Sequence, residues 1–258
     1  MRTCGIDCGS ETLKIFLCLD GEVKWLRATY DSDSLPLFVE KTVTGFLKEE
    51  GLRLKDLEGV VATGVGRKAV SFADRNLPEF FCLAKAIEKL FPSAGTAIDG
   101  GAKNLTAIRC KEGKVSKFLT NTRCASGTGV FLKIVAEILC VSIDDLDRLY
   151  FLSQNPCDIQ STCAVFTESE IISLVHQRKS IEDIARGAIW GLSGRIAALL
   201  MELGIGEDIA FSGGIARMKS VVSAVEERLQ KSILVPEDPD VVNAFGASLI
   251  AEEMIHKG

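Results

Sequence analysis

Short apolar runs of strand length alternate along this chain with longer segments whose apolar residues recur every three or four positions, the spacing of a helix with one buried face. Strands are predicted over Leu13–Leu19, Glu58–Thr63, Leu105–Cys110, Asp208–Phe211 and Ile233–Val235. Helices are predicted over 36–50, 79–90, 127–139, 161–175, 181–203, 216–230 and 240–256. Alternation of strands and helices throughout a chain is typical of an α/β fold.

The chain contains an internal repeat. Residues 6–13 match residues 98–105 without a gap, at an offset of 92 residues, and the match continues through the following strand. In each copy an apolar strand ends at an Asp, and a turn that contains glycine leads into a second strand. Asp20-Gly21 and Glu112-Gly113 then predict a hairpin turn into a third strand.

A repeated unit of this kind predicts two related α/β halves that face each other, with the ligand cleft between them. We place the N-terminal lobe at 1–95 and the C-terminal lobe at 96–239. The closing helix over 240–258 can be shared with the N-terminal lobe. No linker rich in proline or serine separates the halves.

The composition is that of a folded chain. Of the 258 residues 47% are hydrophobic, and the formal net charge is −5, whereas disorder needs fewer apolar residues and more net charge. The mild negative charge argues against a nucleic-acid partner, which requires a basic face. No apolar run approaches the roughly 18 residues of a membrane span, and no signal-peptide segment follows Met1, so we expect a cytoplasmic protein without a membrane partner.

Four glycine-containing turns could bring backbone N–H groups close to an anion. They are Asp7-Cys8-Gly9-Ser10-Glu11-Thr12, Asp99-Gly100-Gly101, Ser212-Gly213-Gly214 and Ala125-Ser126-Gly127-Thr128-Gly129. Because Asp7 and Asp99 occupy equivalent repeat positions, both should face the cleft and hold Mg²⁺ through water or orient an attacking water. Lys14 could add a cation for phosphates. Each turn taken alone is weak evidence, and each Asp alone could simply stabilise its turn.

The order and spacing of the first three turns resemble the phosphate-1, phosphate-2 and adenosine motifs of the actin-like ATPase and sugar kinase fold. The resemblance implies a duplicated ribonuclease-H-like architecture with ATP or ADP and Mg²⁺ between two lobes. It implies Asp99 as the catalytic residue and Asp7 and Asp99 as magnesium ligands. The implied nucleotide-binding residues are Gly9, Ser10, Glu11, Thr12, Lys14, Gly100, Gly101, Gly127, Thr128, Gly129, Gly213 and Gly214.

Nine cysteines occur, and none forms a C-x-x-C pair. In a reducing compartment they should not form disulfides, and most are expected to be small buried residues. Cys124 and Cys163 each precede a predicted helix, whose N-terminus stabilises a thiolate. Two thiolates are too few for a cubane cluster, which takes four, but a two-fold dimer would supply two from each chain. The alternative is that both are ordinary buried cysteines.

The segments Arg123-Cys124-Ala125-Ser126-Gly127-Thr128-Gly129 and Cys163-Ala164-Val165-Phe166-Thr167-Glu168 resemble those that flank the cluster in the BadF/BadG/BcrA/BcrD ATPase family. Its best-known members activate 2-hydroxyglutaryl-CoA dehydratase. The resemblance implies that Cys124 and Cys163 bind one [4Fe–4S] cluster shared across a homodimer. It also implies ATP-driven donation of one electron to an iron–sulfur dehydratase or reductase.

The second phosphate motif departs from the family pattern D-I-G-G-Q-D-x-K. Lys103 stands in place of the Gln, Asn104 in place of the second Asp, and Thr106 in place of the Lys. This departure predicts a divergent member whose ATP hydrolysis is slow, rearranged or absent. Two other functions therefore compete with electron donation: a small-molecule kinase of the same fold, and a nucleotide-binding sensor with little hydrolysis.

Overall fold

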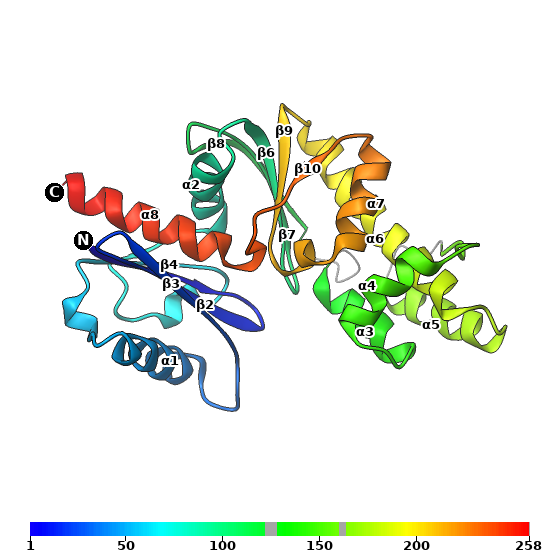
Figure 1. Cartoon of the computed structure of the whole chain (residues 1–258), viewed down its shortest axis with the longest axis horizontal. Coiled ribbons are helices and arrows are strands. Elements are labelled where there is room, and N and C mark those ends of the chain that lie inside the picture. The colour runs from blue at the N-terminus through cyan, green and yellow to red at the C-terminus, as the bar shows by residue number, and fades with distance from the viewer. Residues whose placement is uncertain (122–127, 160–163, 258) are drawn as a thin grey trace.

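The computed structural model describes residues 1–121, 128–159 and 164–257. Two mixed β-sheets lie side by side, with a group of helices beyond the second sheet (Figure 1). The first sheet has the order β3 (Glu22–Thr29), β2 (Thr12–Leu19), β1 (Arg2–Cys8), β4 (Gly59–Thr63) and β5 (Arg75–Asn76). The second has the order β10 (Ile233–Leu234), β9 (Asp208–Ser212), β6 (Ala94–Gly100), β7 (Leu105–Lys111) and β8 (Lys114–Asn121).

The two sheets repeat one arrangement. In each, a central strand pairs antiparallel with the next strand along the chain and parallel with a strand that returns after a helix. The registers are equivalent, since Asp7 lies opposite Lys14 and Asp99 lies opposite Thr106. The expected duplicated fold is confirmed by this pairing and by the structural relatives described below.

The hairpins that close each repeat turn where an acidic residue precedes glycine. Asp20 and Gly21 have φ of 54° and 96°, and Glu112 and Gly113 have φ of 51° and 67°. Positive φ at both positions is the geometry of a two-residue turn that matches the twist of the flanking strands. The turn chemistry in the sequence therefore corresponds to the observed backbone.

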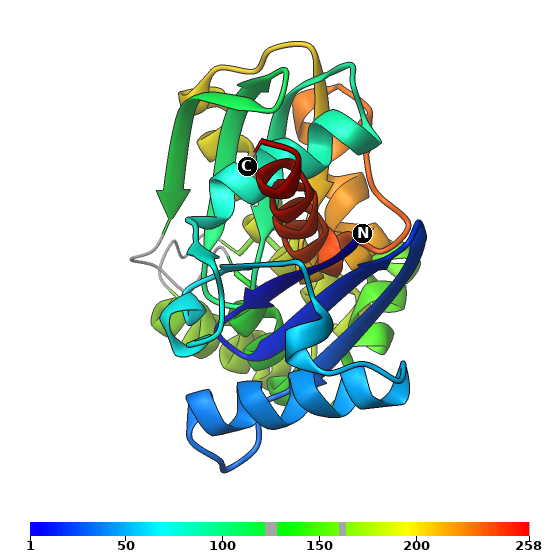
Figure 2. The ribbon, with the colours of Figure 1, turned by 90° about the vertical axis from the view of Figure 1, so that its left-hand side faces the viewer.

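Helices α2 (Glu79–Leu90) and α8 (Val242–Lys257) pack against each other between the sheets (Figures 1 and 2). Helix α8 also lies on β1, where Gly5 allows a close approach. A Cβ atom at Gly5 would lie 1.9 Å from the backbone oxygen of Ala244. The apolar face of α2 packs on Ala97 and Ile108 of the second sheet. The proposed lobe boundary after residue 95 stays a prediction.

The remaining helices complete the molecule. Helix α1 (Leu35–Glu49) covers the first sheet. Beyond the second sheet lie α3 (Gly129–Ile138), α4 (Ile143–Leu152), α5 (Ala164–His176), α6 (Ile181–Leu203) and α7 (Lys219–Leu229). Among the described residues α6 is long and apolar enough to cross a membrane, but 56% of its most apolar segment is buried inside this fold. Its burial is that of a core helix.

The structure differs from the sequence-based expectations at a few places. Helix α4 has no counterpart among the predicted helices, although Ser142 and Asp145 cap its N-terminus reciprocally. The helix expected from residue 216 begins at Lys219, because a 3₁₀ turn, η4 (Gly214–Arg217), precedes it. A similar 3₁₀ turn, η5 (Pro239–Val241), delays the start of the last helix.

Candidate functional site

The first phosphate turn connects β1 to β2. The backbone N–H of Gly9 donates to the carbonyl of Thr12 at 3.0 Å, which closes the turn. A Cβ atom at Gly9 would lie 2.9 Å from Nζ of Lys14 and 3.0 Å from the backbone oxygen of Thr12, so a larger residue would crowd this turn. Ser10 and Thr12 add hydroxyl groups at the same turn. These hydroxyl groups can donate to an anion at the turn.

Lys14 and Asp7 form a buried ion pair across the β1–β2 ladder. Nζ of Lys14 donates to Oδ2 of Asp7 at 3.0 Å, and the two side chains are only 14% and 7% exposed. Burial acts to lower the pKa of Lys14, but the charge and hydrogen bond of Asp7 outweigh it and leave this pKa raised. Lys14 therefore stays positively charged at neutral pH, and its charge is directed at the carboxylate of Asp7.

The second phosphate turn has the same construction. The N–H of Gly101 donates to the carbonyl of Asn104 at 2.8 Å, the counterpart of the bond from Gly9 to Thr12. Two further bonds anchor α3 to this turn: the N–H of Gly129 reaches the carbonyl of Gly101 at 3.1 Å, and that of Val130 reaches Ala102 at 2.9 Å. The start of α3 is thus fastened to the second phosphate turn.

Asp99 is the second-last residue of β6, beside this turn. The hydroxyl of Ser212 donates to Oδ1 of Asp99 at 2.9 Å. Burial, followed by the neighbouring carboxylates of Glu79 and Asp7, raises the pKa of Asp99 to about 7. Asp99 therefore exchanges a proton near neutral pH, as a group that handles protons in catalysis does.

Glu79 is a site residue that the sequence reasoning missed. It begins α2, and Oγ1 of Thr106 donates to its Oε1 at 2.8 Å. Burial raises the pKa of Glu79, while the Thr106 bond and nearby cations oppose this shift. The available signal was weak: an acidic residue at a helix start, 20 positions before Asp99 in the sequence.

The third turn packs directly on the second. Gly213 has φ of 86°, and a Cβ atom there would lie 2.4 Å from the backbone oxygen of Gly100. Gly214 is exposed, with open space where its Cβ would be. Nearby, the buried carboxylate of Asp240 accepts from Nη1 of Arg27 at 3.1 Å and from Nη1 of Arg217 at 3.4 Å. This carboxylate links the first sheet to the third turn.

Several predicted residues lie around these turns in other roles. The carboxylate of Glu11 forms an ion pair with Lys133 of α3 rather than standing free. Thr128 is buried immediately before α3. Lys103 is exposed and forms no ion pair with the described part of the chain. Gly127, Cys124 and Cys163 lie outside the described residues.

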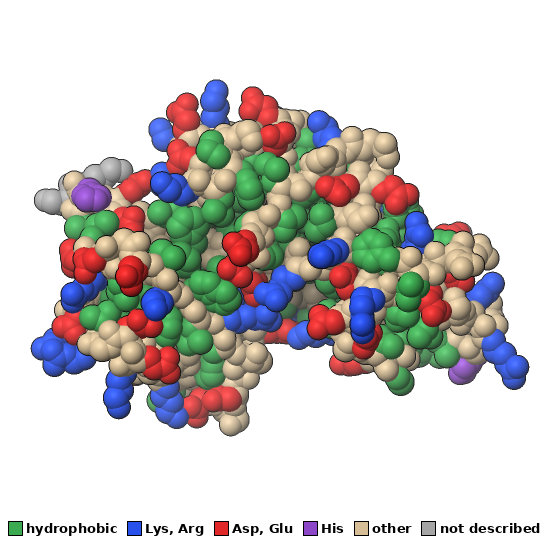
Figure 3. All heavy atoms as spheres, viewed as in Figure 1, with side chains coloured by type: hydrophobic (Ala, Val, Ile, Leu, Met, Phe, Trp, Pro, Cys, Tyr) green, Lys and Arg blue, Asp and Glu red, His purple; other side chains and the backbone are tan. Residues whose placement is uncertain are grey.

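The described residues contain no cluster of three or more His, Cys, Asp or Glu side chains able to enclose a metal ion. Asp7 and Asp99 are two carboxylates on neighbouring turns, and Mg²⁺ in nucleotide sites commonly takes one or two carboxylates together with waters and phosphates. This donor set fits a magnesium ion that arrives with a nucleotide. Figure 3 shows acidic and basic side chains interspersed where the two sheets meet.

A cavity of about 470 Å³ opens beside the first phosphate turn. Its lining residues are Gly9, Ser10, Tyr30, Asp33, Leu35, Phe38, Val65 and Gly66. All of them belong to the first sheet and its connections. The hydroxyl of Tyr30 donates to the carbonyl of Gly9 at 2.9 Å, so this wall supports the phosphate turn from behind.

Comparisons with known proteins match this geometry to one family. The model of the BadF/BadG/BcrA/BcrD ATPase family matches residues 4–251. A 2-hydroxyisocaproyl-CoA dehydratase activator from Clostridioides difficile is 33% identical over 252 residues, covering 97% of this chain and 95% of the relative. The chain therefore belongs to the BadF/BadG/BcrA/BcrD ATPase family.

Solved structures agree. Component A of (R)-2-hydroxyglutaryl-CoA dehydratase from Acidaminococcus fermentans has a TM-score of 0.94 at 30% identity, covering 99% of both chains. The activator from Clostridium difficile with bound ADPNP has a TM-score of 0.93 at 31% identity, covering 100% of this chain and 96% of the other. A ROK hexokinase from Thermus thermophilus shares the fold alone, with a TM-score of 0.54 at 10% identity and coverage of 99% and 100%.

Proposed function

We propose that this chain is an ATP-dependent activator that passes one electron to an iron–sulfur enzyme of the 2-hydroxyacyl-CoA dehydratase or aryl-CoA reductase type in the cytoplasm. The observation that carries the proposal is similarity along nearly the whole chain to a 2-hydroxyisocaproyl-CoA dehydratase activator, 33% identical over 252 residues. A relative from Thauera aromatica that is named as part of benzoyl-CoA reductase, 30% identical over 260 residues, supports the wider partner class.

The nucleotide would lie between the two phosphate turns, with its adenosine end at Gly213 and Gly214. Closed backbone turns at Gly9 and Gly101 support this placement, as does the ADPNP in the similar activator structure. Asp7 and Asp99 would hold Mg²⁺ through water, and the ion pair with Lys14 would orient the carboxylate of Asp7. Asp99 is the group best suited to accept a proton from an attacking water.

A [4Fe–4S] cluster would be held by Cys124 and Cys163 of each subunit. Thiolates are the usual ligands of such a cluster, which would supply a low-potential electron. Helix α5 begins one residue after Cys163, α3 begins five residues after Cys124, and the two helices contact each other. The donor chemistry and the adjacent helix starts fit the group.

The homodimer is supported by exposed apolar side chains close to Cys163. Phe166, three residues further on, is 68% exposed, and Ile172 and Val175 of the same helix are 40% and 39% exposed. Large exposed apolar side chains are candidates for contact with a second copy. A second copy packed on α5 would cover part of them.

The link between nucleotide and cysteines would be α3. Its first turn is hydrogen-bonded to Gly101 and Ala102 of the second phosphate turn. A shift of that turn on nucleotide binding or hydrolysis would therefore move the helix that follows Cys124. Packed elements with discrete arrangements transmit such shifts over longer distances.

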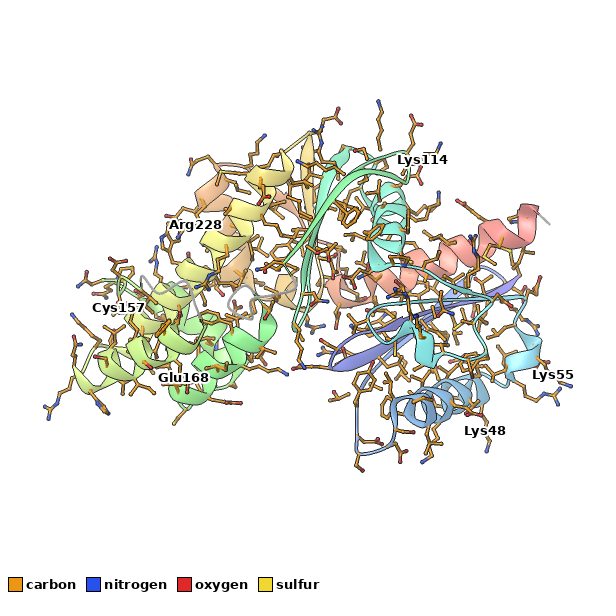
Figure 4. All side chains as sticks on the ribbon, turned by 180° about the vertical axis from the view of Figure 1, so that it is seen from behind. Lys48, Lys55, Lys114, Cys157, Glu168 and Arg228 are labelled. Carbon is orange, nitrogen blue, oxygen red and sulfur yellow. The ribbon has the colours of Figure 1, made fainter. Side chains whose placement is uncertain are left out.

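Anaerobic purification followed by iron and sulfide analysis tests the proposal. About four irons per dimer are expected, and Cys124→Ala or Cys163→Ala should each lose them while the fold persists by circular dichroism. Cys157→Ala is the matched control. Cys157 lies beside α6, held by a bond from its N–H to the carbonyl of Asp183 at 3.0 Å (Figure 4), and its removal should leave the iron content unchanged.

Unchanged iron in both ligand variants would refute the cysteine assignment. Phosphate transfer to a metabolite by iron-free protein would instead identify a kinase. ATP turnover equal to that of buffer, together with tight ADP binding, would identify the nucleotide sensor.

A further inference from the structure

The first phosphate turn carries a negative charge where it should receive a negatively charged ligand. Glu11 lies between Ser10 and Thr12, the two hydroxyl residues of the turn, and its side chain is 27% exposed. A carboxylate at this position repels polyphosphate unless a cation offsets it. The turn therefore requires a compensating positive charge.

Lys14, on the strand that follows the turn, does not provide this compensating charge. Nζ of Lys14 is bound to Asp7 at 3.0 Å in a buried pair. The compensating cation comes instead from the second half of the chain, because Lys133 of α3 pairs with Glu11. These two residues are 122 positions apart in the sequence.

The helix that carries Lys133, α3, is held in place by hydrogen bonds at its first turn. The first turn of α3 donates to the carbonyls of Gly101 and Ala102 at 3.1 and 2.9 Å. One turn further along, Lys133 reaches across to the first phosphate turn. A single helix thus contacts both phosphate turns, and the pair exists only while the two halves are close together.

We propose that Lys133 is a specificity-determining residue, which neutralises Glu11 from the opposite half and so allows the first phosphate turn to accept a nucleoside triphosphate. The inference rests on the proposed function only for the place of the nucleotide. Without Lys133, the unpaired Glu11 opposes each negative charge of the ligand. A triphosphate loses more affinity than a diphosphate, because it carries the additional charge.

Direct binding measurements test this inference with Lys133→Gln, Glu11→Gln and the double variant. In metal-free buffer, Lys133→Gln should weaken a non-hydrolysable ATP analogue about tenfold and ADP about threefold, the range expected of a partly exposed charge pair. The double variant should return to within about twofold of the wild type. Lys133→Arg, which keeps the charge, should bind as the wild type does.

Lys24→Gln is the matched control, since Lys24 pairs with Glu50 within the first half at 4.0 Å, away from the phosphate turns, and should change neither affinity. The loss caused by Lys133→Gln should shrink at high salt, as screening weakens exposed charge interactions.

Two results would overturn the inference. Equal weakening of ATP analogue and ADP would show that Lys133 has no role in telling them apart. Failure of Glu11→Gln to rescue Lys133→Gln would show that Lys133 acts on the phosphates directly. Wild-type protein that binds neither nucleotide would refute the proposed nucleotide site itself, a failure that the variants do not produce.

Discussion

The two halves share one backbone plan and distribute charge differently over it. In the first half Asp7 lies opposite Lys14, and the two form a buried ion pair. In the second half the equivalent Asp99 lies opposite Thr106, which gives its hydroxyl to Glu79 instead. Asp99 accepts from Ser212 and forms no salt bridge with the described residues, although the charge of Lys14 acts on it.

This difference separates two tasks. Asp7, paired with the buried Lys14, joins β1 to β2 beside the first phosphate turn. A carboxylate crowded by other acids, with its pKa raised to about 7, can take up and release a proton. The two halves keep the same strand register, and the different residue at one position of it, Lys14 against Thr106, gives the two carboxylates different surroundings.

Among the variants considered, removal of Lys14 should lower the free energy of unfolding most. Lys14→Met leaves the carboxylate of Asp7 buried and unpaired, and loss of one partner from a buried pair costs about 3–5 kcal/mol. The midpoint of urea unfolding without nucleotide should fall accordingly. The double variant Asp7→Asn, Lys14→Met should recover most of the loss; an unchanged midpoint in Lys14→Met would mean that the pair is not buried.

The second half should show its titration in the pH dependence of stability. Because the pKa of Asp99 is about 7 in the folded protein and 3.8 in the reference state, the folded state binds the extra proton between these values. The stabilisation from this proton is full below about pH 4 and is lost as pH rises through 7.

Asp99→Asn removes the titrating carboxyl group and with it this dependence of stability on pH. The amide oxygen of the new side chain can still accept the hydrogen bond from Ser212. In magnesium-free buffer the variant should match the wild type near pH 4 and exceed its free energy of unfolding by about 4 kcal/mol at pH 8. Urea unfolding at both pH values measures the difference. Parallel curves for the two proteins would show that Asp99 does not titrate in this range.

A third comparison concerns the centre of each sheet. Gly5 in β1 and Ala97 in β6 occupy equivalent repeat positions. Gly5→Ala would drive a methyl group into the backbone of α8, where the oxygen of Ala244 lies 1.9 Å from the added carbon. Overpacking of this kind typically costs about 1–3 kcal/mol, whereas Ala97→Gly should cost about 0.5–1 kcal/mol. Chemical denaturation of both variants measures the two losses in free energy of unfolding. Equal losses would mean that α8 can move away from the added methyl group at little cost.

Sequence reasoning recovered the features that are local or repeated. The offset of 92 residues predicted both hairpins and two of the glycine turns, because a repeat reveals itself without any tertiary contact. Helix α6 was predicted over its full length, 181–203, since a long amphipathic segment leaves a clear period.

The missed features depend on contacts between distant segments. Glu79 meets Thr106 only after α2 packs on the second sheet, and no local pattern pairs Glu11 with Lys133. Helix α4 was overlooked although its capping pattern, Ser142 followed by Asp145, was readable. The assignments of Cys124 and Cys163 stay predictions, because these residues lie outside the described ranges.

The smallest expected effect is the most direct test of the asymmetry. Thr106→Val keeps the shape of a side chain that is 1% exposed and removes the bond to Glu79. A single hydrogen bond to a carboxyl group is worth about 1–2 kcal/mol, so urea unfolding should show a loss well below that of Lys14→Met at the equivalent position. The pKa of Glu79 should rise further, because the Thr106 bond holds it down, and NMR titration of the side-chain carboxyl measures this change. Equal costs at positions 14 and 106 would show that the second half has a charge compensation of its own, and the division of tasks between the halves would then fail.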